Sequence, residues 1–220
     1  GQVKRAQLVE IVKGLEAKGT VETAHRVGNR MRMVFDYAVD SGVMESHPAA
    51  GLSRVIKTPQ VKHMSCVDVK DAGKLFRDIL TYDDPVTRIG LMLLALTMTR
   101  TVELRHWRWD QIIPGKDVWV VPGEIMKMKI PHVVPLSRQT KALLREVEPL
   151  TGDQDLVVGS LVKPNHSISE NTLLFALYRL GYRGKMTGHG FRALASTVLN
   201  QESPFAHDVI ERQLAHQETD

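Results

Sequence analysis

The chain has 220 residues, of which 43% are hydrophobic and 25% are charged, as in ordinary globular domains, and its length allows one large domain or two smaller ones. Its longest apolar run, residues 89–98, is much shorter than the roughly 20 residues that span a bilayer, so we expect no membrane segment. The single cysteine, Cys66, excludes an intramolecular disulfide and a multi-cysteine zinc site, and it is typical of a cytoplasmic protein.

The positive charge lies in the first part of the chain. Residues 1–65 contain ten Lys or Arg and six Asp or Glu, whereas the remainder contains nineteen of each, so the first segment carries the whole net charge of +4. This excess is expected of a segment that contacts a polyanion. A solvated helical surface would produce the same excess.

Two helical patterns fill this first segment. The second spans residues 21–39, with Thr20 before it and Gly42 after it as suitable caps. At 100° per residue, one face of this helix is apolar and is expected to be buried: Val27, Met31, Val34, Phe35 and Ala38. Arg26, Arg30 and Tyr37 share another side, which suits contacts to the phosphates of a duplex or forms a plain exposed surface.

Prolines, a glycine and basic residues then interrupt the helical periodicity. We interpret residues 57–65 as a basic interdomain linker, which separates a helical domain over residues 1–56 from a larger domain over residues 66–220. In the larger domain, helical patterns cover residues 67–80 and 84–98, the latter nearly all apolar and expected to be buried.

Residues 109–136 change character. Three short β-rich runs, separated by turn residues, predict a small antiparallel sheet there. Helical patterns return over residues 137–147, 169–180, 189–200 and 208–214. The predicted fold class is therefore mainly α with a small antiparallel β-sheet (α+β), in two domains.

Two places in the first half of the larger domain carry candidate chemistry. Arg100 is predicted to end the apolar helix, an unusual position for a charge unless a ligand or a partner holds it. Glu103 lies three residues further on and can brace Arg100 by an ion pair, or the pair is only structural. Lys127 and Lys129 precede a β-run, where a turn can direct an ammonium group at a substrate or leave it solvated.

The stretch TGHGFRALAST, residues 187–197, predicts a helix with a polar side. His189 and Arg192 lie on that side, next to small residues that let a large group approach. An arginine can bind two oxygens of a phosphodiester at once, whereas the alternative is a helix simply exposed to solvent. The chain then reaches IERQLAH, which ends at His216.

Taken in order, these elements resemble the tyrosine recombinase (phage integrase) family over most of the chain. ALTMTRTVELRHWRWDQI resembles the first arginine box, KMKIPHVVPL the lysine hairpin, GHGFRALAS the second box and IERQLAH the last histidine. The sequences MKMKIPHVVPLS and TGHGFRALAST are similar to those of integrases from satellite phages and pathogenicity islands. ETAHRVGNRMRMVFDYAVDSGVMESHPA resembles most of the core-binding domain of that subgroup.

The resemblance implies a role for each matching position. Arg100 and Arg192 would clamp the scissile phosphate, and Glu103 would orient Arg100. Lys127 would be the general acid for the 5′-oxygen, with Lys129 as the alternative in a shifted hairpin. His189 would assist proton transfer, and His216 would hydrogen-bond the phosphate.

The resemblance also implies the partners. The substrate would be double-stranded DNA at a core or attachment site, contacted by Arg26, Arg30, Tyr37, Lys57 and Lys129. No metal or other cofactor is required. The parent enzyme would act as a homotetramer in a synaptic complex, with accessory DNA-bending or directionality proteins, in the bacterial cytoplasm at the nucleoid.

The nucleophile of the family is a tyrosine a short distance past the last histidine, and none of the tyrosines of this chain stands there: Tyr37, Tyr82, Tyr178 and Tyr182. We therefore expect a piece truncated at both ends, which binds DNA and recombines it only as part of a longer enzyme. A non-catalytic DNA-binding regulator on the same scaffold is the alternative. A hydrolase of small phosphoesters fits the basic first domain less well, and the wording of the boxes disfavours a type IB topoisomerase.

Overall fold

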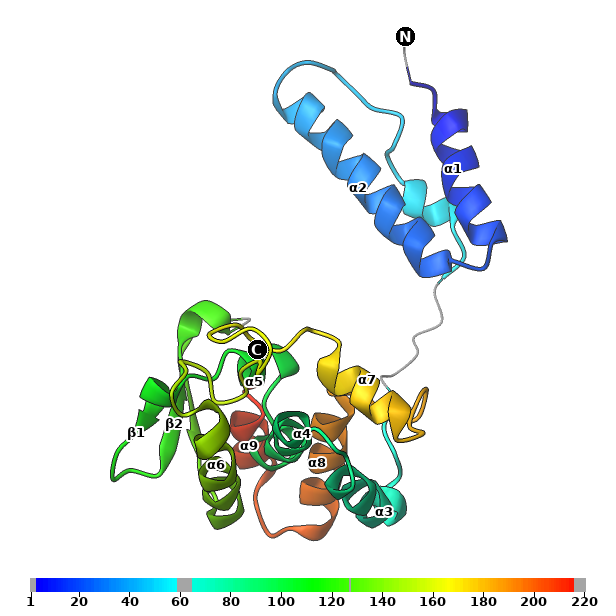
Figure 1. Cartoon of the computed structure of the whole chain (residues 1–220). Helices are drawn as coiled ribbons and strands as arrows, with labels where there is room; N and C mark the ends of the chain where they lie inside the picture. The colour runs from blue at the N-terminus through cyan, green and yellow to red at the C-terminus, as the bar shows by residue number, and fades with distance from the viewer. Residues whose placement is uncertain (1–2, 59–64, 127, 216–220) are drawn as a thin grey trace. The chain divides into compact units, whose positions relative to one another are not determined.

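The computed structural model describes residues 3–58, 65–126 and 128–215, and the chain divides into two compact units, residues 1–63 and 64–220 (Figure 1). The predicted fold class is confirmed, because helices dominate and the sheet is small and antiparallel. Within the described ranges, no helix is long and apolar enough to cross a bilayer.

The first unit packs α1 (Arg5–Ala17) against α2 (Val21–Asp40) and a 3-10 turn (Leu52–Val55). The predicted start of α2 is confirmed, and its end lies one residue further on. The predicted buried face is partly wrong, because Val34 is 68% exposed while Ala24 and Gly28 are buried. Gly28 faces the 3-10 turn and the residue after it, where an added Cβ would lie 3.8 Å from Leu52 Cδ2 and 3.4 Å from Ile56 Cδ1. Because Ala24 and Gly28 are small, α2 packs closely on its neighbours along the side that carries these two residues.

Lys57 is attached to the first unit. Its backbone N–H donates to the Glu16 carboxylate at 2.9 Å, and its carbonyl lies 2.9 Å from His25 Nε2. The hydrogen bond from the Lys57 backbone lowers the pKa of Glu16 below its ordinary value, with Lys13 adding to the effect. The residue with which the predicted linker begins therefore continues the fold of the helical unit, while its side chain stays exposed.

The second unit is built around α4 (Pro85–Thr97), which contacts α3 (Val69–Leu80), α5 (Thr101–Arg105), α6 (Arg138–Thr151), α7 (Thr172–Arg179) and α8 (Gly190–Glu202). The last helix of this unit, α9 (His207–Gln213), packs on α8. Burial of α4 is confirmed, since most of its side chains are inaccessible to solvent. The prediction for α6 is four residues too short, because its buried positions continue through Val147 to Thr151.

The sheet contains β1 (Ile112–Ile113), β2 (Val118–Val121) and β3 (His132–Pro135), antiparallel and in that order, as predicted for residues 109–136. In the register of β2 and β3, Trp119 lies opposite Val134 and Val121 opposite His132. Trp119 is buried, and its ring stacks on that of Trp107 with 4.1 Å between ring centroids. The sheet is thereby fixed to the segment that follows α5.

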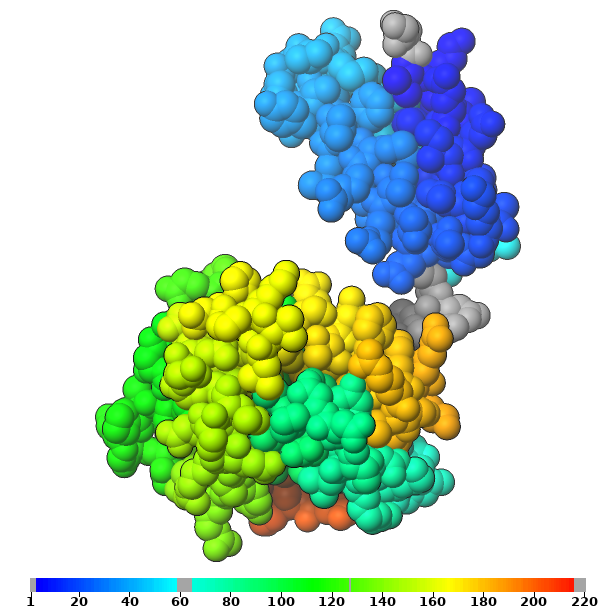
Figure 2. Space-filling model, viewed as in Figure 1, coloured from blue at the N-terminus to red at the C-terminus, as the bar shows by residue number. Residues whose placement is uncertain are grey.

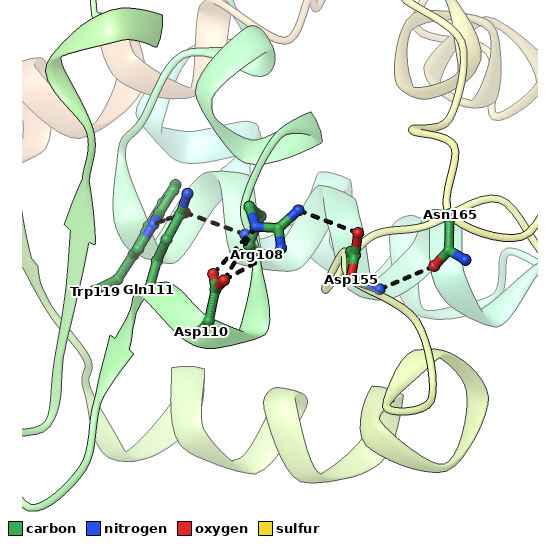
Figure 3. A network of polar contacts seen from close by, with 6 residues as sticks. All are labelled: Arg108, Asp110, Gln111, Trp119, Asp155 and Asn165. Atoms are coloured by element: carbon green, nitrogen blue, oxygen red, sulfur yellow. Dashed lines mark hydrogen bonds and ion pairs between the residues drawn. The ribbon is translucent and has the colours of Figure 1, made fainter.

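A polar network also holds the segment that follows α5 (Figure 3). Arg108 forms ion pairs with Asp110 and Asp155, each at 3.2 Å. Gln111 Oε1 accepts hydrogen bonds from the backbone N–H of Arg108 and from Trp119 Nε1. The network joins the segment after α5, strand β2 and the loop that follows α6, so the sheet has a defined position on the helices.

Figure 2 shows one face of the second unit, formed mainly by the hairpin, the chain from α6 to α7, and α3 with α4. Only a small orange-red part of α8 and α9 reaches the lower edge of this view. On this side, α8 and α9 are covered by the other elements, and the buried residues of α8 lie in its first part, between Gly190 and Leu194.

Candidate active site

Arg100 immediately precedes α5, and Glu103 holds it there. The sequence places Arg100 at the end of the apolar helix; instead α4 ends at Thr97, and Arg100 is the N-cap residue of α5. Its Nη1 and its backbone N–H each donate to the Glu103 carboxylate at 2.7 Å. Glu103 is 1% exposed, whereas the Arg100 side chain is 23% exposed, so a buried anion fixes a cation that solvent still reaches.

Arg192 lies beneath the surface. The prediction that the helix presents His189 and Arg192 together on an accessible polar side is wrong, because Arg192 is 4% exposed while His189 is exposed at the start of α8. Its guanidinium donates to the carbonyl oxygens of Met98 and Leu214. A guanidinium needs several acceptors when it is buried, and these two carbonyls come from the loop before α5 and from the end of α9.

The loop between α4 and α5 therefore meets the last helix at Arg192. Gln213 strengthens this junction, since its side-chain amide donates to the Thr97 carbonyl at 3.4 Å. Met98, whose carbonyl accepts from Arg192, has a left-handed backbone with φ of 56°. This conformation is uncommon for a residue with a side chain, and it ends α4 just before Arg100.

His132 is a site residue that the sequence reasoning missed. It begins β3, and its Nε2 lies 3.2 Å from the Gln213 carbonyl oxygen. A histidine at the start of a predicted strand, three residues after the second lysine of the turn, is the signal in the sequence that points to it. The strand pattern by itself does not connect this histidine with the arginines, because only the folded chain brings them together.

The charges of this cluster act on one another. Burial, and then the charge of Arg100, lower the pKa of Arg192 to about 10, while Glu103 and Glu211 oppose the shift. Burial also lowers the pKa of His132, with Arg192 and Arg100 adding to the effect, while the Gln213 carbonyl and Glu103 oppose it. At neutral pH, Arg192 therefore remains charged and the His132 imidazole is neutral.

A cavity of about 170 Å³ opens at this cluster. Arg100, His132 and Arg212 give it polar walls, and apolar side chains from the turn and the start of β3 complete it: Met126, Met128, Ile130 and Pro131. An anionic group that enters the cavity meets Arg100 directly, with Arg192 interacting electrostatically with Arg100 from its buried position.

Two glycines of the second box lie in close contact with neighbouring segments. A Cβ on Gly188 would lie 2.5 Å from Thr101 Oγ1, and one on Gly190 would lie 2.7 Å from the Ser65 carbonyl oxygen. Both positions are close approaches that a larger residue would block. Gly188, just before α8, therefore lies against Thr101 at the start of α5, which brings the neighbouring His189 near the segment that carries Arg100.

The remaining candidates differ in position. Lys129 lies in the turn before β3, where its Nζ donates to the Glu124 carbonyl at 2.8 Å and its backbone has φ of 58°. Lys127 and His216 lie outside the described residues. In the first unit, Arg26, Arg30, Tyr37 and Lys57 are all exposed, the first three along one side of α2.

Tyr182, the tyrosine closest in sequence to the second box, is engaged elsewhere. It is 7% exposed, and its hydroxyl donates to Asp78 at 2.7 Å. Burial, and then the bond with Asp78, raise the pKa of its phenol. A buried phenol held in this way is a structural link between α3 and the chain after α7.

Comparison with known proteins gives matches along both units. Residues 1–55 match the phage integrase central domain, and residues 69–220 match the phage integrase family. The prophage integrase IntA of Escherichia coli K12 is 35% identical over 216 residues, which cover 98% of this chain and 52% of that protein. The integrase of enterobacteria phage P4 is 33% identical, covering 99% of this chain and 53% of that protein.

The chain thus spans about half the length of these two relatives. A solved structure of the lambda integrase tetramer bound to a Holliday junction superimposes with a TM-score of 0.77 at 16% identity, covering 99% of this chain and 65% of that one. This similarity concerns the fold.

Proposed function

The chain belongs to the phage integrase family, and on that basis we propose that it serves in site-specific DNA recombination by tyrosine-mediated strand cleavage and rejoining. The observation that carries the proposal is the arginine pair. Arg100 and Arg192 come from segments far apart in sequence. Arg100 lines the cavity, and the buried Arg192, bound to the Met98 carbonyl, interacts with the charges of Arg100 and Glu103. Binding alone would not need a buried guanidinium held against a second one.

The electrostatics of the pair suit a scissile phosphate. Two guanidinium groups in a partly buried site repel each other, and Glu103 reduces that repulsion. A phosphodiester would reduce it further, and the additional negative charge that develops during cleavage would be favoured most. Arg100 would contact the phosphate, and Arg192, fixed by two carbonyls, would supply charge that needs no reorganisation.

Proton transfer is assigned to the remaining matching positions. We assign His189 to assist it, Lys127 to act as general acid at the 5′-oxygen, and His216 to hydrogen-bond the phosphate. Lys129 is the weaker candidate for the acid, since its ammonium is bound to the Glu124 carbonyl in the turn. No cofactor is needed, because the covalent DNA–tyrosine bond conserves the energy for rejoining.

Both units would contact duplex DNA. Arg26, Arg30 and Tyr37 on α2, together with Lys57, would contact the backbone on the side of the first unit. Four protomers would act together, as the tetrameric lambda integrase does on its Holliday junction, with accessory DNA-bending or directionality proteins. We propose further that the 220-residue chain binds such DNA without cutting it, since none of its tyrosines stands at the position of the family's nucleophile.

Covalent capture of DNA tests this proposal. A nicked duplex with the core site of the element is incubated with this chain and, separately, with the longer protein encoded by its gene. We expect a covalent band on a denaturing gel from the longer protein only. In that protein, Arg100→Gln should reduce the band roughly 100-fold or more. Arg88→Gln is the matched control, since the Arg88 side chain also pairs with a carboxylate, Glu146, and is 25% exposed, but it does not line the cavity.

A band from the 220-residue chain would overturn the proposal that it only binds. No band from the longer protein, despite tight binding, would favour the non-catalytic regulator.

The salt dependence of binding tests the contacts of α2. The slope of the logarithm of the DNA-binding constant against the logarithm of the salt concentration is negative. Arg26→Ala combined with Arg30→Ala should reduce its magnitude by about two, because each arginine would neutralise one phosphate. Arg32→Ala, on another side of α2 and paired with Asp36, is the control that should leave the slope unchanged.

A further inference from the structure

His132 connects the sheet to the last helix. Its Nε2 is 3.2 Å from the Gln213 carbonyl, and its ring lines the same cavity as Arg100. A carbonyl oxygen only accepts hydrogen bonds, so Nε2 must carry the hydrogen. In the neutral ring, this fixes the tautomer and leaves Nδ1 without a proton.

The Gln213 carbonyl belongs to the end of α9, where helix carbonyls have no partner within the helix. Two neighbouring carbonyls are satisfied by side chains from other elements: Gln213 by His132 from β3, and Leu214 by Arg192 from α8. The Gln213 side chain adds a bond to the carbonyl of Thr97, the last residue of α4. The end of α9 is thus held at three points, all adjacent to the arginine pair.

From this geometry, we propose that His132 is a positioning residue, whose Nε2–H holds the end of α9 so that the Leu214 carbonyl meets Arg192. The inference rests on the proposed function, in which Arg192 stabilises the scissile phosphate. It assigns His132 no contact with DNA. Without the hydrogen bond from His132 to the Gln213 carbonyl, the end of α9 would no longer be held to the sheet. The Leu214 carbonyl, which accepts from Arg192, would then be less firmly positioned.

The test compares two substitutions. His132→Leu removes the donor at similar bulk, while His132→Gln retains an N–H at a comparable reach. His166→Leu is the control, because His166 is exposed and lies 3.0 Å from the Pro164 carbonyl in a loop away from the cavity. Hydrogen exchange at the amides of residues 213–215 reports how firmly the end of α9 is held.

We expect exchange at residues 213–215 to be roughly fivefold to tenfold faster in His132→Leu, and near the unsubstituted rate in His132→Gln and His166→Leu. In the longer protein, single-turnover cleavage of the nicked duplex should slow by about 10- to 100-fold in His132→Leu, because small displacements of catalytic groups are costly. DNA affinity should change less than about twofold, because many phosphate contacts contribute to it. His132→Gln should restore most of the cleavage rate.

Unchanged exchange in His132→Leu, or equal effects of Leu and Gln, would overturn the proposal. Should the Leu variant fail to fold, ¹⁵N spectra of the unsubstituted chain decide, because a proton on Nδ1 of neutral His132 would contradict it. Absence of cleavage by the unsubstituted longer protein would instead count against the proposed function, and the exchange measurement would still test His132.

Discussion

Replacing Glu103 with glutamine is expected to destabilise the second unit measurably. Glu103 is 1% exposed and accepts two hydrogen bonds from Arg100, each at 2.7 Å. Hydrogen bonds to charged groups contribute about 1.5–3 kcal/mol each. Glutamine keeps the size and one acceptor oxygen, so one charged bond is lost.

Solvent reaches Arg100, whose side chain is 23% exposed, and screens part of this loss. We therefore expect Glu103→Gln to lower the free energy of unfolding by about 1–2 kcal/mol. For a unit of this size, 1 kcal/mol shifts the melting temperature by about 2–4 °C, so the melting temperature should fall by roughly 2–8 °C. The loss of the carboxylate also increases the repulsion between Arg100 and Arg192, which adds to the effect.

Thermal unfolding followed by circular dichroism measures this change. The matched control is Asp110→Asn. The Asp110 carboxylate also pairs with an arginine, Arg108, but the Asp110 side chain is 67% exposed, so its loss should leave the melting temperature unchanged. An equal fall in both variants, or a fall of less than about 1 °C in Glu103→Gln, would refute the view that a buried carboxylate stabilises the arginine pair.

Three further outcomes are expected. Gly188→Ala should lower stability by about 1–3 kcal/mol in chemical denaturation, because its Cβ would meet Thr101 Oγ1 at 2.5 Å, and Thr101→Ala in the same chain should recover part of the loss. Gln111→Leu should cost about 1–3 kcal/mol, since buried Trp119 Nε1 loses its acceptor; no change would mean that another acceptor replaces it. Stability should fall as the pH drops below about 6.5, because the unfolded chain protonates His132 more readily than the folded one, and His132→Gln should flatten this part of the pH profile.

Local patterns were sufficient to predict most elements. The periodicity of α2, the apolar character of α4 and the β-rich runs before Leu136 depend on neighbouring residues, so their types and approximate bounds are readable from the sequence. The order of the boxes likewise indicated the family, because each box is a short local motif. Where α6 was predicted too short, the cause was a buried face that continues past the point where the pattern weakens.

The arrangement of the candidate site depends on contacts between distant segments. A helical projection separates the sides of α8, but only the packing of α8 on α4 and α9 determines that Arg192 is buried and bound to two carbonyls. His132 enters the site for the same reason, since its neighbours in sequence include no arginine, and Gln213 reaches it only in the folded chain. Sequence alone therefore determined the secondary structure and the family, because helix and strand preferences and short motifs are local. Tertiary structure alone decided which side chains share the cavity, because burial and hydrogen bonding depend on residues that are distant along the chain.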